Sequence, residues 1–190
     1  MGLKLLVDQR DIQKRGGVHS RYPASSVVAD LLRSVDGSRV LDVTYGEGRF
    51  YRVYRPELLI GADPQIWKWV VKPDVFIPQP VWKLLALDWL KHFKPRVLVC
   101  DPPWGIRHRK RPLWFGDRIL IGSSEVIISY AFMLARQLNI PYLLLHYNRL
   151  WKEKDWTRVQ TISFRYVTRY LNNPSLQKTT YFILYKRGEA

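Results

Sequence analysis

The stretch RVLDVTYGEG, residues 39–48, is typical of a short buried strand that runs into a tight turn. Gly46 and Gly48 let the backbone of this turn pass close to a ligand, because neither residue carries a Cβ atom. The pattern D-x-x-x-G-x-G is not the dinucleotide-binding fingerprint, whose third glycine is replaced by Tyr51, and no G-K-[ST] of a P-loop follows. The residues of this turn either bind a ligand or form only a tight turn with an acid that caps a helix.

Short apolar segments recur along the chain and predict an α/β fold. Four of them are expected strands, at 58–62, 83–87, 96–100 and 142–146. Apolar residues spaced by three and four predict amphipathic helices at 23–35 and 124–138. The stretches 159–167 and 179–186 have no helical segment between them and should form an antiparallel hairpin. Together these elements predict a mostly parallel seven-stranded sheet with that hairpin at its C-terminal end and helices on both faces.

Acidic residues follow several of the expected strands, at the edge where sheets of this kind bind ligands. Asp63 follows Asp42 by 21 residues, and an acid at this place can bind the hydroxyls of a ribose. With no pyrophosphate motif nearby, these residues suggest a nucleoside-containing ligand such as S-adenosylmethionine. Asp88, at the expected end of strand 83–87, either binds an adenine amino group or is an acid in a surface turn.

The sequence Asp101-Pro102-Pro103-Trp104 comes directly after the expected strand 96–100. The prolines stiffen the backbone and have no N–H of their own. The Asp101 carboxylate and the Pro102 carbonyl are then two neighbouring acceptors for the hydrogens of an exocyclic amino group. Such a pair favours the pyramidal nitrogen whose lone pair can attack a methyl sulfonium, and Trp104 offers a face on which a base can stack. The structural alternative is a Pro-Pro turn with a buried tryptophan.

Residues 41–48, Asp63 and 101–104 together resemble the class I S-adenosylmethionine-dependent amino-methyltransferases, most closely the N6-adenine/N4-cytosine nucleic-acid group. Residues 22–25 are similar to the family segment that helps hold the methionine end of the cofactor. The resemblance implies a Rossmann-like methyltransferase fold and a catalytic role for Asp101, Pro102, Pro103 and Trp104. The expected cofactor-binding residues are Tyr22, Pro23, Asp42, Thr44, Tyr45, Gly46, Gly48, Asp63 and Asp88.

The chain departs from this family at two points. Thr44 stands where an aromatic residue is common, although Tyr45 is adjacent. Members that modify DNA often carry a separate target-recognition domain, for which 190 residues leave no room. The second departure argues against sequence-specific modification of duplex DNA. It leaves RNA, or DNA that a partner subunit recognises, as the substrate.

Charge points to the same kind of partner. The chain has 31 Lys and Arg against 16 Asp and Glu, a formal net charge of +15, which predicts a nucleic-acid partner. Residues 105–120 are a basic, aromatic loop directly after the Asp-Pro-Pro-Trp motif, and cations with stacking rings suit a single-stranded substrate. A solvated loop is the alternative. The expected substrate-binding residues are Arg107, Arg109, Lys110, Arg111, Trp114 and Phe115.

Composition narrows the remaining choices. A chain that is 47% hydrophobic and 25% charged is neither disordered nor collagen-like, and we expect one domain over 1–190 with an N-terminal arm at 1–19. The single Cys100 forms no internal disulfide, and the four histidines lack metal-ligand spacing, so no metal is expected. No apolar run approaches the length of about 20 residues that spans a membrane, and we expect a cytoplasmic protein.

These observations predict an S-adenosylmethionine-dependent N-methyltransferase that acts on a nucleic-acid base, with adenine N6 in DNA or RNA as the first choice. Two other acceptors stay open, namely guanine N2 in RNA and the side-chain amide of a protein glutamine. A third hypothesis is a non-catalytic, basic RNA-binding module on the same fold.

Overall fold

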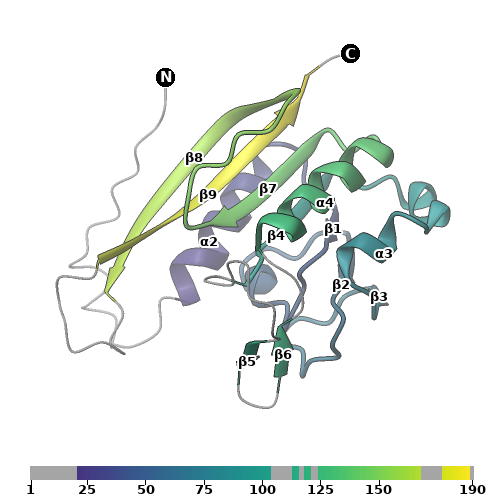
Figure 1. Cartoon of the computed structure of the whole chain (residues 1–190), viewed down its shortest axis with the longest axis horizontal. Coiled ribbons are helices and arrows are strands. Elements are labelled where there is room, and N and C mark those ends of the chain that lie inside the picture. The colour runs from purple at the N-terminus through teal and green to yellow at the C-terminus, as the bar shows by residue number, and fades with distance from the viewer. Residues whose placement is uncertain (1–20, 104–112, 116–117, 121–123, 168–176, 189–190) are drawn as a thin grey trace.

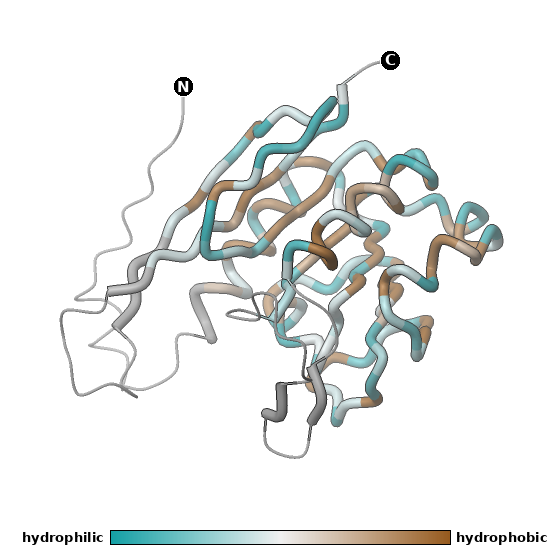
Figure 2. Tube along the Cα trace, in the orientation of Figure 1, coloured by the Kyte–Doolittle hydropathy of each residue, from teal (hydrophilic) through white to brown (hydrophobic). Residues whose placement is uncertain are grey.

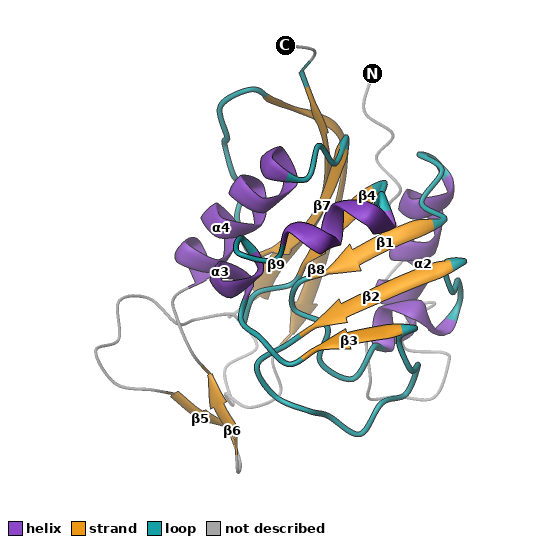
Figure 3. Ribbon diagram, turned by 90° about the vertical axis from the view of Figure 1, so that its right-hand side faces the viewer, coloured by secondary structure: helices purple, strands orange, loops and turns teal. Residues whose placement is uncertain are grey.

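The computed structural model describes residues 21–103, 113–115, 118–120, 124–167 and 177–188. A seven-stranded sheet in the order β3-β2-β1-β4-β7-β9-β8 forms its centre (Figures 1 and 3). The strands are β1 (Arg39–Asp42), β2 (Leu58–Ala62), β3 (Val75–Ile77), β4 (Val97–Cys100), β7 (Tyr142–Tyr147), β8 (Trp156–Val167) and β9 (Gln177–Arg187). The pairs from β3 to β7 are parallel, whereas β9 runs antiparallel to both β7 and β8. The predicted sheet with its C-terminal hairpin is confirmed.

Two layers of helix cover the sheet. Helix α2 (Arg21–Arg33) lies on one face, and α3 (Val81–Leu84) and α4 (Ser124–Gln137) lie on the other (Figure 3). Successive residues of a strand point to opposite faces, so β1 contributes Val40 to the apolar cluster beneath α2 and Leu41 to the cluster beneath α3 and α4. Figure 2 shows the hydrophobic residues gathered along the central strands.

The third strand lies earlier in the chain than the sequence predicts. It is β3, Val75–Ile77, and not 83–87. Asp74 fixes it beside β2, because its carboxylate accepts a hydrogen bond from the Leu59 backbone N–H and its own N–H donates to the Leu59 carbonyl. The residues taken for a strand, 83–87, instead begin inside α3 and continue past its end, and Val81 and Leu84 of this helix are buried at helical spacing. Short apolar runs of this kind do not distinguish a strand from a buried helical turn.

The connections near the carboxyl ends of the strands also differ from expectation. Between β1 and β2 the structure has only a 3-10 helix, η1 (Arg49–Arg52), and the connection from β2 to β3 contains no helix. A second 3-10 helix, η2 (Asp88–Phe93), precedes β4. The expected loop 105–120 contains a two-stranded hairpin of β5 (Leu113–Phe115) and β6 (Arg118–Leu120).

Within the described ranges, no helix is long and apolar enough to cross a bilayer.

Parallel register brings the ends of the central strands to one edge. Asp42 pairs with Gly61 of β2 and Val99 of β4, and Cys100 of β4 pairs with Leu145 of β7. The residues that follow these positions, including Asp101, therefore meet at the carboxyl edge of the sheet. This is the edge at which open α/β sheets bind ligands.

Candidate functional site

A buried hydrogen-bond network joins the ends of β1 and β4. The Asp42 side chain, in a residue that is 2% exposed, accepts from the Thr44 backbone N–H at 2.9 Å and from the Tyr51 hydroxyl at 2.8 Å. The Thr44 hydroxyl lies 3.3 Å from Asp42 Oδ1 and accepts the Asp101 backbone N–H at 2.6 Å. Asp42 is thus satisfied by protein donors, and its carboxyl supports the site from below the surface.

Burial gives Asp42 an unusual acidity. Removal of its carboxyl from water raises its pKa to about 7, against the opposing effect of hydrogen bonds from Thr44 and Tyr51. The negative charge of Asp101 raises the pKa further. Asp42 therefore exchanges a proton near neutral pH in the folded protein.

The two glycines of the turn face different surroundings. At Gly48, which has φ +72°, an added Cβ would lie 2.5 Å from both the Tyr45 hydroxyl and the Val71 carbonyl oxygen. At Gly46, which has φ +53°, it would meet only the Thr44 carbonyl oxygen, at 3.9 Å. Gly48 is needed for packing against protein, whereas Gly46 lies on the open side of the turn. The sequence treats the two glycines alike, and the structure supports only Gly46 as a place of ligand approach.

Tyr45 is a support beneath the turn. Its ring stacks on Tyr51 with 5.8 Å between the centroids, and its hydroxyl donates to the Val71 carbonyl at 2.7 Å. A Cβ added to Gly61 would lie 2.5 Å from the same ring, so the ring covers β2. Only 4% of Tyr45 is exposed. Its side chain is packed inside the protein.

Asp63 shapes the open side of the turn. Its Oδ2 accepts the Gly46 backbone N–H at 3.1 Å, and its Oδ1 accepts the Gln65 backbone N–H at 2.9 Å. The Asp63 backbone N–H donates to the carbonyl of Ile77, which ties the end of β2 to the end of β3. Asp63 therefore lies beside Gly46, directly after β2.

Asp88 does not follow a strand. Its side chain is 83% exposed in η2 and lies 3.1 Å from the Lys91 ammonium. Ile77, Pro78 and Gln79 stand at the end of the third strand instead. The premise for placing Asp88 against an adenine ring is wrong, because the expected strand 83–87 is not formed.

The segment Asp101-Pro102-Pro103 is held from three sides. The Asp101 N–H donates to Thr44, and the Asp101 Oδ1 lies 2.9 Å from Nδ1 of His146. The Pro103 carbonyl accepts from the Ser124 hydroxyl at 2.5 Å, and Ser124 is the first residue of α4. The Asp101 side chain is 35% exposed, and its Oδ2 has no hydrogen-bond partner within the described ranges. One carboxylate oxygen is therefore anchored while the other can accept from a ligand.

His146 is the site residue that sequence reasoning missed. It is 9% exposed at the carboxyl end of β7, and its ring stacks on Phe182 with 3.9 Å between the centroids. Its Nε2 lies 2.8 Å from the hydroxyl of Thr180 on β9. The available signal was the strand 142–146 ending in histidine, because parallel pairing of Cys100 with Leu145 sets the next residues, Asp101 and His146, side by side.

Several predicted residues can be placed only in part. Tyr22 and Pro23 belong to the first turn of α2, and Trp114 and Phe115 belong to β5. Five residues lie outside the described ranges, namely Trp104, Arg107, Arg109, Lys110 and Arg111. No group of three potential metal ligands occurs among the residues that the structure describes.

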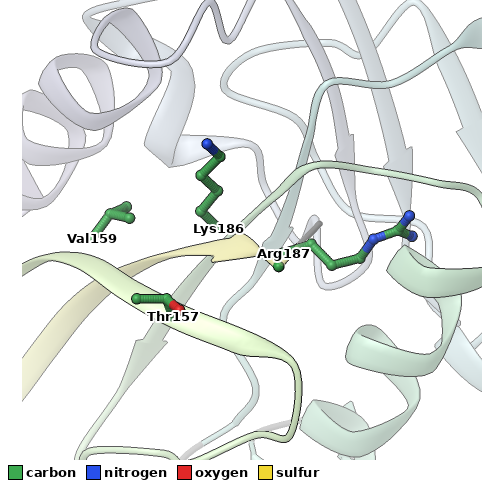
Figure 4. A pocket seen from close by; sticks show the side chains of 5 residues that line it. Thr157, Val159, Lys186 and Arg187 are labelled. Atoms are coloured by element: carbon green, nitrogen blue, oxygen red, sulfur yellow. The ribbon is translucent and has the colours of Figure 1, made fainter. Parts of the chain in front are cut away.

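A hollow of about 370 Å³ lies elsewhere, lined by Thr157, Val159, Lys186, Arg187 and Gly188 (Figure 4). Lys186 pairs with Tyr142, the first residue of β7, so the hollow is at the edge opposite Asp101. The Arg187 guanidinium donates to the Arg136 carbonyl. This hollow contains none of the site residues.

Comparison with known proteins supports the fold. No protein-family model and no curated protein sequence matches the chain. Among solved structures, it is similar to a proposed RNA methyltransferase from Pyrococcus horikoshii, with TM-score 0.56 and 10% identity over 88% of this chain and 85% of the other. It also matches an S-adenosylmethionine-dependent methyltransferase from Agrobacterium tumefaciens (TM-score 0.49, 12% identity, 91% of this chain and 64% of that one). A third match is the human methyltransferase 10 domain containing protein (0.47, 10%, 90% and 83%). At such identities the first match shows a shared Rossmann-like fold.

We expect Gly48→Ala to destabilise the fold more than Gly46→Ala. Both variants carry the strain of roughly 1–2 kcal/mol that a side chain meets at positive φ. Only Gly48→Ala also forces Cβ against Tyr45 and Val71, which adds about 1–3 kcal/mol of overpacking. Urea denaturation of the two variants measures the difference. Equal losses of unfolding free energy would show that Gly48 is not closely packed.

Asp42 should make the protein less stable as the pH rises from about 4 to about 7. The folded chain holds the Asp42 proton up to about pH 7, whereas the unfolded chain releases it near 3.8. The folded state binds more protons between these values, so the free energy of unfolding falls with rising pH, by up to about 1.4 kcal/mol per pH unit. Asp42→Asn should reduce this slope in urea denaturation between about pH 5 and 7. Asp30→Asn, on the exposed side of α2, should keep the wild-type slope, and an unchanged slope in Asp42→Asn would contradict the assignment.

Proposed function

We propose that the protein is an S-adenosylmethionine-dependent methyltransferase that methylates an exocyclic amino group of a nucleic-acid base, with adenine N6 in RNA as the first choice. The observation that carries the proposal is the Asp101 carboxylate, anchored at Oδ1 and open at Oδ2, at the start of Asp-Pro-Pro-Trp on the carboxyl edge of the sheet. The Pyrococcus horikoshii protein with the same fold, itself a proposed RNA methyltransferase, supports RNA as the substrate.

The cofactor fits the residues around the first turn. Gly46 leaves space next to the backbone, and the Asp63 carboxylate lies beside it, with its Oδ2 on the Gly46 N–H. We assign ribose binding to Asp63 and close backbone contact to Gly46. Tyr22 and Pro23, in the first turn of α2, would contact the methionine end. Asp42, Thr44, Tyr45 and Gly48 hold the turn in shape from below.

S-adenosylmethionine supplies an electrophilic methyl group on a sulfonium. The residues of this chain then have one task, which is to present the amino nitrogen in line with that methyl. Asp101 Oδ2 and the Pro102 carbonyl would accept hydrogen bonds from its two hydrogens, and Trp104 would stack on the base. As the N–C bond forms, the S–CH3 bond would break to leave a neutral thioether, and the nitrogen would then release one proton to solvent. Catalysis therefore comes from orientation and electrostatic stabilisation, and needs no metal. A base in a duplex would first have to flip out of the stack.

The acceptor can be identified directly. Labelled S-adenosylmethionine is incubated with the protein and separate pools of RNA, DNA and protein, and the labelled pool is digested to its monomers. We expect label in N6-methyladenosine from RNA. Label in guanosine or in glutamine would show that the acceptor is guanine N2 or a protein amide and not adenine N6. If no pool is labelled and the protein does not bind the cofactor, the non-catalytic RNA-binding alternative is favoured.

Asp101→Ala should separate chemistry from binding. Its carboxylate acts on the amino group, so the variant should keep cofactor affinity in calorimetry and lose most methyl transfer. Asp88→Ala is the matched control, because it removes an exposed carboxylate in η2 and should leave both properties unchanged. Turnover of Asp101→Ala within a fewfold of wild type would refute the proposed chemistry.

The basic loop should bind phosphates. Replacement of Arg107, Arg109, Lys110 and Arg111 by Ala should lower the salt dependence of single-stranded nucleic-acid affinity by about 0.7 per lost contact, or up to roughly 2–3 in all. Trp114→Ala should weaken binding without changing that slope, because stacking releases no ions. The control variant replaces four exposed cations near the amino ends of the strands, Arg33, Lys91, Lys94 and Arg96. An unchanged slope in the loop variant would show that these cations do not contact phosphate.

A further inference from the structure

His146 occupies a position between two other polar side chains from neighbouring strands. Its Nδ1 lies 2.9 Å from Asp101 Oδ1, and its Nε2 lies 2.8 Å from the Thr180 hydroxyl. The three side chains form a series of hydrogen bonds that runs from β9 through β7 to the end of β4. Thr180 is 5% exposed and His146 9%, whereas the Asp101 side chain is 35% exposed, so the series leads from the interior to the candidate site.

Aromatic packing fixes the plane of the His146 ring. Phe182 stacks on it at an interplanar angle of 9°, and Phe50 meets it edge-on with 5.8 Å between the centroids. Phe50 and Phe182 also contact one another at 62°. The stacking fixes the plane of the ring, and the contacts with Asp101 and Thr180 select the ring orientation that places Nδ1 beside Asp101.

The donors and acceptors around His146 select one tautomer of its neutral ring. An ionised carboxylate is an acceptor only, so Nδ1 of His146 must carry the hydrogen in that contact. In the neutral ring Nε2 is then an acceptor, and the Thr180 hydroxyl must donate to it. The other acceptor near this hydroxyl, the Tyr147 carbonyl, is farther away, at 3.3 Å. Thr180 therefore stabilises the form of His146 that can donate to Asp101.

We propose that Thr180 and His146 are positioning residues for Asp101, which they hold with Oδ1 bound and Oδ2 directed at the amino group of the substrate. The assignment rests on the proposed function, because it concerns the acceptor of that reaction. Thr180 and Asp101 together favour the Nδ1–H form of His146, and the Nδ1 hydrogen then holds Oδ1 of the Asp101 carboxylate. The Thr44 bond to the Asp101 N–H fixes the backbone but leaves the side-chain rotation to His146.

Nitrogen NMR of the free protein tests the expected tautomer of His146 without any substrate. Long-range ¹⁵N spectra distinguish the Nδ1–H from the Nε2–H form of a neutral histidine, and the His146 signals are assigned by their loss in His146→Asn. We expect the Nδ1–H form in wild type and in Thr180→Ser, which keeps the hydroxyl. Thr180→Val has nearly the same shape without the hydroxyl and should raise the fraction of the Nε2–H form above that of wild type, because it removes one of the two contacts that select the Nδ1–H form. A wild-type ring in the Nε2–H form would overturn the proposal whatever the activity.

Steady-state kinetics tests whether Thr180 and His146 position Asp101 for the reaction. Thr180→Val and His146→Phe, which keeps an aromatic ring on Phe182, should lower kcat between about 10- and 100-fold, as expected for a misplaced reacting group. Cofactor affinity in calorimetry should stay at the wild-type value, which shows that both variants are folded. Thr180→Ser should retain activity, and His146→Asn should recover part of it, since its amide can donate from the position of Nδ1. The exposed His92 gives a matched control, His92→Asn, with unchanged kcat.

The outcomes separate this inference from the proposed function. If Thr180→Val changes the tautomer while kcat stays at the wild-type value, the positioning role is refuted, and an inactive Asp101→Ala still supports amino-methyl transfer. If Asp101→Ala keeps its turnover, the proposed chemistry fails and the role of His146 in it fails as well. Loss of kcat in Thr180→Val with full activity in Thr180→Ser supports the positioning of Asp101 by Thr180 through His146.

Discussion

The site depends on one side chain, the hydroxyl of Thr44, which bridges the ends of two parallel strands. It lies against the buried carboxyl of Asp42 at the end of β1 and accepts the backbone N–H of Asp101 at the end of β4. A buried N–H without a partner is costly, so this bond fixes how the chain leaves β4. The two acids thereby acquire separate places. Asp42 lies in the core with all its donors supplied by protein, and Asp101 lies at the surface with one oxygen open.

Regular elements with strong local patterns are well predicted from sequence. The strand 58–62 begins and ends at the predicted residues. The two strands of the C-terminal hairpin are found where predicted, although each is longer than expected, and the prediction succeeds because no helical pattern separates them. The third strand fails for a physical reason. Val75–Ile77 is three residues long and is held by the Asp74 side chain on β2, a tertiary contact that leaves no periodic signal. The run 83–87 has more apolar residues but packs as the continuation of a short helix.

The candidate site is predictable only as far as its chemistry is local in sequence. Asp101 and its prolines form a contiguous motif, and the acid at Asp63 follows from spacing along the chain. Gly46 and Gly48 have the same sequence context, and their difference arises from Tyr45 and Val71, which fold against one of them. His146 is invisible to motif reasoning, since its partner is 45 residues away and becomes adjacent only through the pairing of β4 with β7.

For the proposed nucleic-acid substrate, which is a polyanion, three acids at one edge of the sheet pose an electrostatic problem. The hydrogen-bond network reduces the exposed negative charge at each acid. Burial keeps Asp42 partly protonated near neutral pH, because its pKa lies at about 7. Asp63 spreads its charge over two backbone N–H groups, and Asp101 has the imidazole of His146 on one oxygen. The fully accessible negative charge at the centre of the edge is thus reduced to one carboxylate oxygen, which the proposed amino group would meet. The chain as a whole carries +15, so the surrounding surface can attract the phosphates of the proposed substrate while this oxygen would accept from its amino group.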